Sequence, residues 1–201
     1  MAVTAIPGYL LLIISALVLF AYIFELTFIY RPLGQSAMHP VTAILAGLIG
    51  LSLILNGQQA QSEKIMAYLV VGISTTILLE HQMNFHVTQV INPFRATVEA
   101  EIALGLRNSV GINTALSFMT LGIALVIMMT RYSTVNMLLG GAAIIPSLGS
   151  IYGYAVHDEI FYQSMSLITS IAVALGSLAV ILSAFFKIKV VQNDHTHLSV
   201  D

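Results

Sequence analysis

The chain has 201 residues, of which 58% are hydrophobic and only 8% are charged, and its formal net charge is −2. A soluble domain carries about 25% charged residues, so this composition excludes a soluble globular fold and predicts an integral membrane protein in a lipid bilayer. The lack of a basic surplus argues against nucleic acid as a partner. The absence of cysteine excludes disulfides and Cys-ligated metals.

Six apolar segments follow one another along the chain, and each is of the length that a membrane-spanning helix needs, about 20 residues. The predicted spans are residues 8–30, 39–56, 64–80, 111–130, 134–155 and 165–186. None of them alternates with a period of two, and a bilayer leaves open strand edges unsatisfied. The predicted fold class is therefore an all-α integral membrane protein with six transmembrane helices.

An even number of spans places both chain ends on one side of the membrane. Lys64, Arg131, Lys187 and Lys189 fall on that side, and Arg31, Arg95 and Arg107 fall on the other. Because basic residues concentrate in cytoplasmic connections, we expect both termini in the cytoplasm.

Three connections then lie on the outer side, at residues 31–38, 81–110 and 156–164. In the longest of them, Val98, Ile102 and Leu106 are spaced four apart, which predicts a short helix over residues 96–106 on the outer membrane surface. A helix packed within the loop, without lipid contact, fits the same spacing equally well. The charged residues around it are predicted to be solvated: Arg95, Glu99, Glu101 and Arg107.

The second, fourth and sixth spans share a pattern in which a threonine precedes a glycine by about two helical turns. The pairs are Thr42 with Gly50, Thr114 with Gly122 and Thr169 with Gly176. This repetition predicts three helical hairpins in the same orientation, each with an outward helix and an inward helix that opens with a polar turn. Small residues at 46–50 and 140–143 are predicted contact surfaces between helices.

The pattern Met-x-Pro-x-Thr-Ala followed by Gly and a Leu/Ile-rich run resembles a family of sensor regions. Residues 38–55, 113–127 and 147–153 carry the resemblance. They are similar to the N-terminal multi-span membrane sensor regions (MASE-like) of bacterial histidine kinases and diguanylate cyclases, over about residues 10 to 186. Such regions continue into a cytoplasmic catalytic or PAS module, whereas residues 187–201 follow here as a predicted cytoplasmic tail.

The resemblance implies a sensor domain over residues 1–186 in a bacterial inner membrane. It would detect a signal at its outer face and transmit it through the last helix to a cytoplasmic output domain or partner. The resemblance further implies a homodimer. An excised domain and a stand-alone relative are both compatible with it.

Histidines and carboxylates gather at the predicted outer edge, and imidazole and carboxylate are the usual ligands of Zn²⁺, Fe²⁺ and Cu²⁺. The candidate metal ligands are His39, His81, His86, His157, Glu80 and Glu159. Glu25 and Asp158 are candidates for a proton site or another ligand. Ionisable groups near the membrane are costly, which favours a functional role for them.

Two other interpretations of these residues stay open: a pH-responsive histidine and carboxylate cluster, and an ordinary polar rim. Glu25 could also simply pair with Arg31. Haem could use Met38 or Met83 as an axial ligand, but it is less favoured than a divalent metal because no mid-span histidine pair is present.

Three functions are therefore in competition. The favoured one is a membrane sensor or ligand-binding domain. The alternatives are a His-rich metalloprotein or haem protein with a redox role, and a small transporter or accessory subunit of a membrane complex. No Walker loop, Rossmann glycine pattern or Gly-x-Ser-x-Gly elbow occurs, so no catalytic residue is assigned.

Overall fold

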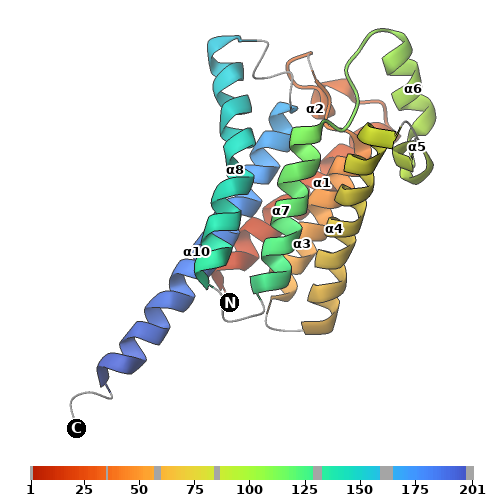
Figure 1. Cartoon of the computed structure of the whole chain (residues 1–201). Coiled ribbons are helices and arrows are strands. Elements are labelled where there is room, and N and C mark those ends of the chain that lie inside the picture. Colours follow the sequence, from red (N-terminus) through yellow and green to blue (C-terminus); the bar gives the residue numbers. More distant parts are fainter. Residues whose placement is uncertain are drawn as a thin grey trace.

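The computed structural model describes residues 2–34, 36–56, 60–83, 87–128, 133–158 and 165–197. All regular secondary structure within these residues is helical, as the sequence predicts. Six long helices form a bundle (Figure 1): α1 (Ala2–Ile23), α3 (Pro40–Leu55), α4 (Ala60–Met83), α7 (Ile112–Met128), α8 (Ser133–Val156) and α10 (Leu167–His197). Three short helices lie at one end of it: α2 (Thr27–Tyr30), α5 (Val87–Ile91) and α6 (Arg95–Ala103).

Four of the long helices are long and apolar enough to cross a membrane. These stretches are Thr4–Ile23, Gln61–Met83, Ser133–Val156 and Leu167–Phe186. The helices α3 and α7 are also apolar, but their 16 and 17 residues fall short of the length that a full span usually takes.

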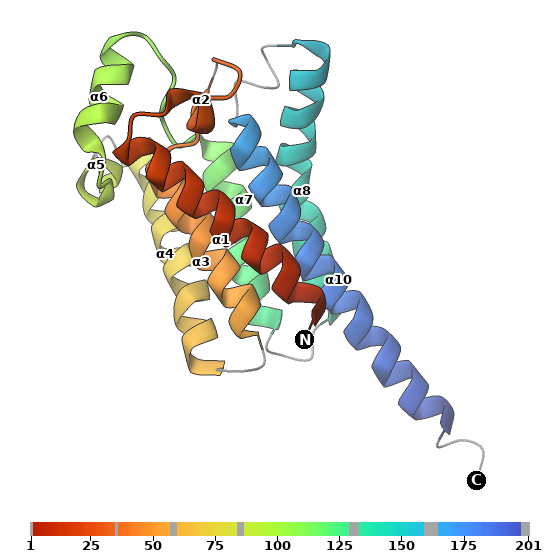
Figure 2. The same cartoon turned by 180° about the vertical axis from the view of Figure 1, so that it is seen from behind.

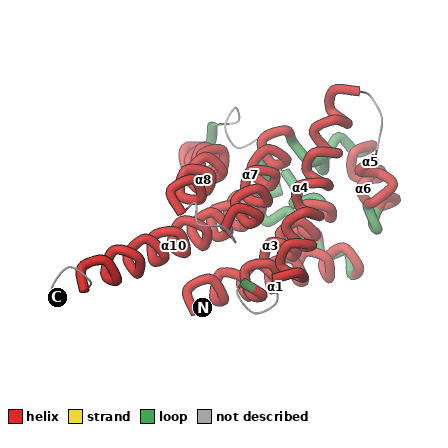
Figure 3. The backbone as a smooth tube through the Cα atoms, turned by 60° about the horizontal axis from the view of Figure 1, so that its bottom comes forward, coloured by secondary structure: helices red, strands yellow, loops and turns green. Residues whose placement is uncertain are grey.

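The six long helices form a closed ring in which each packs against its neighbours in the sequence and α1 packs against α10. The helices α3, α7 and α10 also contact one another across the middle of the bundle. Figure 3 shows the bundle with its lower end turned forward. In α10, 56% of the most apolar stretch is buried, against 28–33% in α1, α4 and α8. The repeated Thr and Gly pattern therefore belongs to the three central helices.

Close helix contacts occur where the sequence places small residues. A methyl carbon added to Gly50 would lie 2.7 Å from the carbonyl oxygen of Gly8, where α3 crosses α1. One added to Gly122 would lie 2.8 Å from Val71, where α7 meets α4. Gly140 approaches α10 in the same way, whereas Gly141 has no atom within 4 Å of such a carbon. Within residues 140–143, the predicted contact surface therefore excludes Gly141.

The first long helix lies nearer the N-terminus than the predicted span of residues 8–30, because it begins at Ala2 and ends earlier. The helix α1 ends at Ile23, and Glu25 has a left-handed backbone with φ of 54°. The chain then turns into α2, so residues 24–30 do not continue the helix. Glu25 is exposed, and Arg31 pairs with a different carboxylate, as described below.

The three short helices lie at the end of the bundle opposite the start of α1 and the end of α10 (Figures 1 and 2). The helix α10 extends past the other helices at the far end (Figure 1). The predicted helix over residues 96–106 corresponds to α6, which is shorter and ends at Ala103.

Candidate functional site

A buried ion pair anchors α6 to the bundle. Arg31 Nη2 lies 2.8 Å from Glu101 Oε2, and the two side chains are only 6% and 9% exposed. The same carboxylate accepts hydrogen bonds from the Tyr30 hydroxyl at 2.8 Å and from Asn108 Nδ2 at 2.6 Å. Three donors, two from the neighbouring residues Tyr30 and Arg31 and one from Asn108, thus converge on Glu101, which offsets the cost of burying its charge.

An aromatic stack lies beside this ion pair. The rings of Tyr22 and Tyr30 are stacked at a centroid distance of 4.1 Å, and Phe94 packs on Tyr22 at 5.4 Å. The Tyr22 hydroxyl donates to the carbonyl of Met38 at 3.1 Å and accepts from Asn108 Nδ2 at 2.8 Å. The stack and the ion pair together fix α6 and the segment after it against the ends of α1 and α3.

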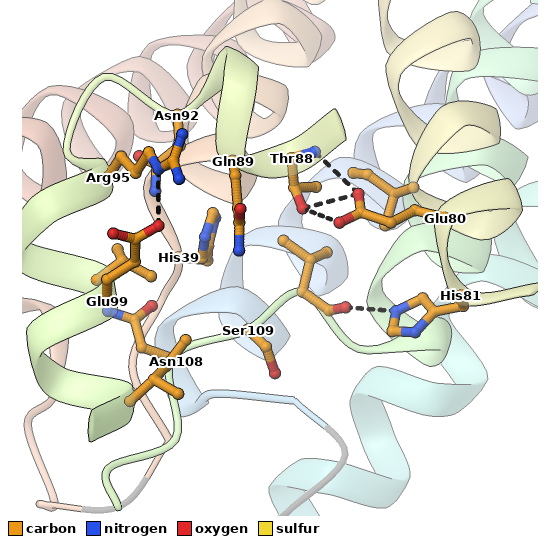
Figure 4. Close-up of a pocket in the computed structure, with 14 residues that line it drawn as sticks. His39, Glu80, His81, Thr88, Gln89, Asn92, Arg95, Glu99, Asn108 and Ser109 are labelled. Carbon is orange, nitrogen blue, oxygen red and sulfur yellow. Dashed lines mark hydrogen bonds and ion pairs between the residues drawn. The ribbon is translucent and has the colours of Figure 1, made fainter. Parts of the chain in front are cut away.

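A cavity of about 350 Å³ lies beneath α5 and α6. Figure 4 shows Asn92, Arg95, Glu99 and Asn108 on one side, Thr88, Glu80 and His81 on the other, and His39 between them. The lining residues are His39, Ile77, Glu80, His81, Thr88, Gln89, Asn92, Arg95, Val98, Glu99, Ile102, Asn108, Ser109 and Val110. The lining combines charged groups, neutral hydrogen-bonding groups and an apolar patch, and we call this space the outer cavity.

Asn108 is the most deeply buried polar residue of the outer cavity, with 1% of its surface exposed. Its amide nitrogen is used twice in the bonds described above, while its carbonyl oxygen Oδ1 has no hydrogen-bond partner. A buried acceptor without a partner is costly.

His39 precedes α3, outside the four candidate spans, and caps that helix. Its Nδ1 accepts a hydrogen bond from the backbone N–H of Val41 at 3.2 Å. Burial lowers the pKa of His39 to about 4, against a smaller opposing effect of the Glu80 carboxylate. The ring is therefore neutral at pH 7, and because Nδ1 holds the lone pair, the proton resides on Nε2.

Glu80 and His81 occupy the end of α4. Glu80 accepts hydrogen bonds from the backbone N–H of Thr88 at 2.9 Å and from its hydroxyl at 2.6 Å, which ties α5 to α4. His81 Nε2 lies 2.8 Å from the carbonyl oxygen of Val110 and must donate, because a carbonyl only accepts. The second ring nitrogen of a neutral His81 is then a lone-pair donor.

A second, smaller cavity of about 70 Å³ adjoins the first, and His39 and Ser109 line both. Its lining residues come mainly from the first turns of α3, α7 and α10 and from the segments before them: Ser36, Ala37, His39, Thr42, Arg107, Ser109, Gly111, Thr114, Met165, Ser166 and Thr169. We call this space the inner cavity.

The structure brings together some of the predicted metal ligands and separates others. His39, Glu80 and His81 line the outer cavity. His157 is exposed with a φ of 56°, and neither it nor Asp158 lines either cavity. His86 and Glu159 lie outside the described residues. Among the residues that the structure describes, no three His, Asp or Glu side chains are arranged to hold a metal ion.

No family model, curated protein or solved structure matches the chain. The resemblance to membrane sensor regions therefore stays a prediction, and a functional argument has to start from the two cavities.

The prediction that Glu101 is solvated is wrong, since it is only 7% exposed, and Asn108 is not among the residues singled out from the sequence. Glu101 is three residues after Val98, so these two share the buried face of α6, whereas Ile102 is exposed. A carboxylate on that face was the available signal. Asn108 lies in irregular backbone, where no periodicity could reveal its burial.

Proposed function

We propose that the chain is a membrane sensor domain that binds a small polar molecule in the outer cavity. The supporting observation is the cavity itself, with its mixed polar lining, at the end of the bundle opposite the start of α1 and the end of α10. Ligand sites are typically concave spaces of this size that combine an apolar wall with a few convergent polar groups.

The lining favours a ligand that both donates and accepts hydrogen bonds. His39 Nε2–H, Ser109 and Arg95 supply donors, and Glu99 supplies acceptors. The wall formed by Ile77, Val98, Ile102 and Val110 is suited to a short apolar portion of the molecule. An amino acid, a polyamine or a similar small polar metabolite has this combination of groups.

Transmission through α10 is the second part of the proposal. This helix packs against α1, α3, α7 and α8, and it begins beside the inner cavity. A ligand that draws α6 and the segment after it toward the bundle would press on the first turn of α10 through Ser109 and the residues that the two cavities share. The far end of α10 is where a cytoplasmic output would attach.

We further propose that all six long helices span the membrane as three hairpins, with both termini in the cytoplasm of a bacterial cell. The apolar composition of α3 and α7 supports this, and their small length deficit is covered because their outer ends open into polar cavities. A homodimer follows from the proposed role as a sensor, since sensors of the resembled type act in pairs.

The proposal is tested with a substitution that fills the outer cavity and leaves the core residues unchanged. We expect small polar compounds, screened by class against the purified protein, to include one class that raises its melting temperature. Ser109→Trp should abolish this rise, because the indole occupies the space of the ligand. Leu104→Trp is the matched control, since Leu104 is 77% exposed and does not line the cavity. An equal rise in both variants, or no rise for any class, would contradict the proposal.

A divalent transition metal at His81 is the second candidate ligand, because the second ring nitrogen of His81 holds a lone pair and Glu80 lines the same cavity. His39 is not counted as a ligand, since its Nδ1 caps α3 and its Nε2 carries the proton. Metal content after incubation with Zn²⁺, Cu²⁺ or Fe²⁺ and dialysis tests this. His81→Ala should lower the metal content and His157→Ala should not, whereas equal metal content in all three proteins would exclude the site.

A further inference from the structure

The first turns of the three central helices are built alike and meet at the inner cavity. The helices α3, α7 and α10 each have a residue before the first turn whose carbonyl accepts the hydrogen bond that starts the helix: His39, Gly111 and Ser166. The three distances are 3.1, 3.0 and 2.9 Å. Three residues after each of them stands a threonine: Thr42, Thr114 and Thr169. All six residues line the inner cavity.

This convergence makes the inner cavity electropositive. The N-terminus of a helix carries the equivalent of about half a positive charge, because its first N–H groups have no partner within the helix. Three such ends face one small space here, and Arg107 also lines it. No carboxylate is present among its described lining residues, so nothing in the lining offsets this potential.

Two buried hydroxyl groups give the independent sign that a ligand belongs here. Thr42 and Thr114 are 1% and 4% exposed, and they line the inner cavity. Within the described part of the chain, neither hydroxyl has a hydrogen-bond partner, whereas the Thr169 hydroxyl contacts Ser166 Oγ at 2.7 Å. Neither hydroxyl oxygen is sealed from the inner cavity, so a bound anion there would accept a hydrogen bond from each.

We propose that the inner cavity binds a small monovalent anion between the first turns of α3, α7 and α10. Its volume of about 70 Å³ suits a halide or a planar oxyanion such as nitrate, and it excludes a large organic acid. The anion would accept from the Thr42 and Thr114 hydroxyls and from first-turn backbone N–H groups other than those of Val41 and Thr169, which already pair with His39 Nδ1 and Ser166 Oγ. It would join the three hairpins at their outer ends, and this role does not depend on the ligand of the outer cavity.

The test compares potassium chloride with potassium gluconate at equal ionic strength, because gluconate is too large for the inner cavity. We expect chloride and nitrate to raise the melting temperature of the purified protein by about 3 °C or more in a saturable way. In the double variant Thr42→Val and Thr114→Val, half-saturation should need at least about tenfold more chloride, since two hydrogen bonds to a charged group are lost. Thr120→Val is the matched control on α7, because its hydroxyl bonds within its own helix and does not face the cavity.

Two further measurements keep the proposal open to refutation if the double variant does not fold. The line width of the ³⁵Cl NMR signal should broaden with wild-type protein, and nitrate should reverse the broadening. In Thr114→Asp a tethered carboxylate occupies the cavity, so chloride should no longer raise the melting temperature. The proposal is overturned if wild-type protein neither broadens the chloride signal nor gains stability over gluconate, which would indicate that the cavity holds water only. An undiminished chloride effect in Thr114→Asp would overturn it as well.

Discussion

Glu101 is the residue on which the outer end of the molecule depends most. Its carboxylate receives the Arg31 guanidinium, a tyrosine hydroxyl and an asparagine amide, and it is almost wholly buried. Burying a charge is costly, and only this number of partners makes it tolerable. The exposed pair Arg95–Glu99, with side chains 56% and 46% exposed, lies on the same helix and provides a direct comparison.

Replacing Glu101 by Gln should destabilise the protein by about 3 kcal/mol, because it leaves the Arg31 charge buried without its counterion. Glu99→Gln should cost less than about 1 kcal/mol, since water screens that pair. The free energy of unfolding in mild detergent, measured by a reversible denaturant titration, distinguishes them. Equal effects of the two substitutions would show that the burial of Glu101 carries no energetic weight.

His39 should make the stability of the protein depend on pH below neutrality. Its folded-state pKa of about 4 lies below the ordinary value of 6.5, so the unfolded chain binds the proton more readily. Stability is therefore complete above pH 6.5 and is lost as the pH falls toward 4, by roughly 3 kcal/mol. His39→Asn keeps a helix-capping acceptor and removes the titration, so its unfolding free energy should vary less over this range. An unchanged pH profile in His39→Asn would assign the effect to other groups.

At the scale of the helices, close backbone contacts decide which glycines can change. Gly50→Ala should destabilise the bundle by about 1–3 kcal/mol, because the new methyl group would meet the carbonyl of Gly8 and the backbone of Leu12 at 2.7 and 3.1 Å. Gly141→Ala meets no neighbour and removes a weak helix former, so it should be neutral or slightly stabilising. Thermal unfolding of the two variants side by side tests this, and a harmless Gly50→Ala would mean that α1 and α3 can separate at little cost.

The positions of the long helices were predictable because apolar runs and their length are local properties. All six predicted segments contain a long helix, and the threonine and glycine repeat identifies the three helices that contact one another at the centre. Periodicity also located α6. These features follow from the immediate neighbours in the sequence, so a single chain was enough to find them.

The remaining features depend on residues that are far apart in the sequence. The chain turns at Glu25 within a hydrophobic run that contains neither Gly nor Pro. Arg31 finds Glu101 across 70 residues, and nothing near either residue indicates the other. The outer cavity is built from five separate segments. The sequence could therefore indicate individual lining residues, but it could not show that they share one cavity.

For the molecule as a whole, the arrangement of the helices leads to a test of orientation. The chain has no cysteine, so Ala100→Cys on α6 and Gln61→Cys on α4 are single reporters at opposite ends of the bundle, and both positions are exposed. An impermeant thiol reagent should label Ala100→Cys in intact cells and Gln61→Cys only after permeabilisation, because the proposed topology puts α6 outside. The reverse pattern would place both cavities in the cytoplasm.

The length of α10 has a mechanical consequence. A helix of 31 residues is about 46 Å long. If its first turn acts as a pivot, a tilt of about 5° displaces the opposite tip by about 4 Å, roughly two to four times the 1–2 Å shift typical of helices at subunit interfaces. The displacement is largest at the tip because the pivot, the first turn of α10, lies at the other end of the helix beside the inner cavity. A tilt that moves the first turn, around Thr169, very little is thereby converted into a displacement of several ångströms at the far tip.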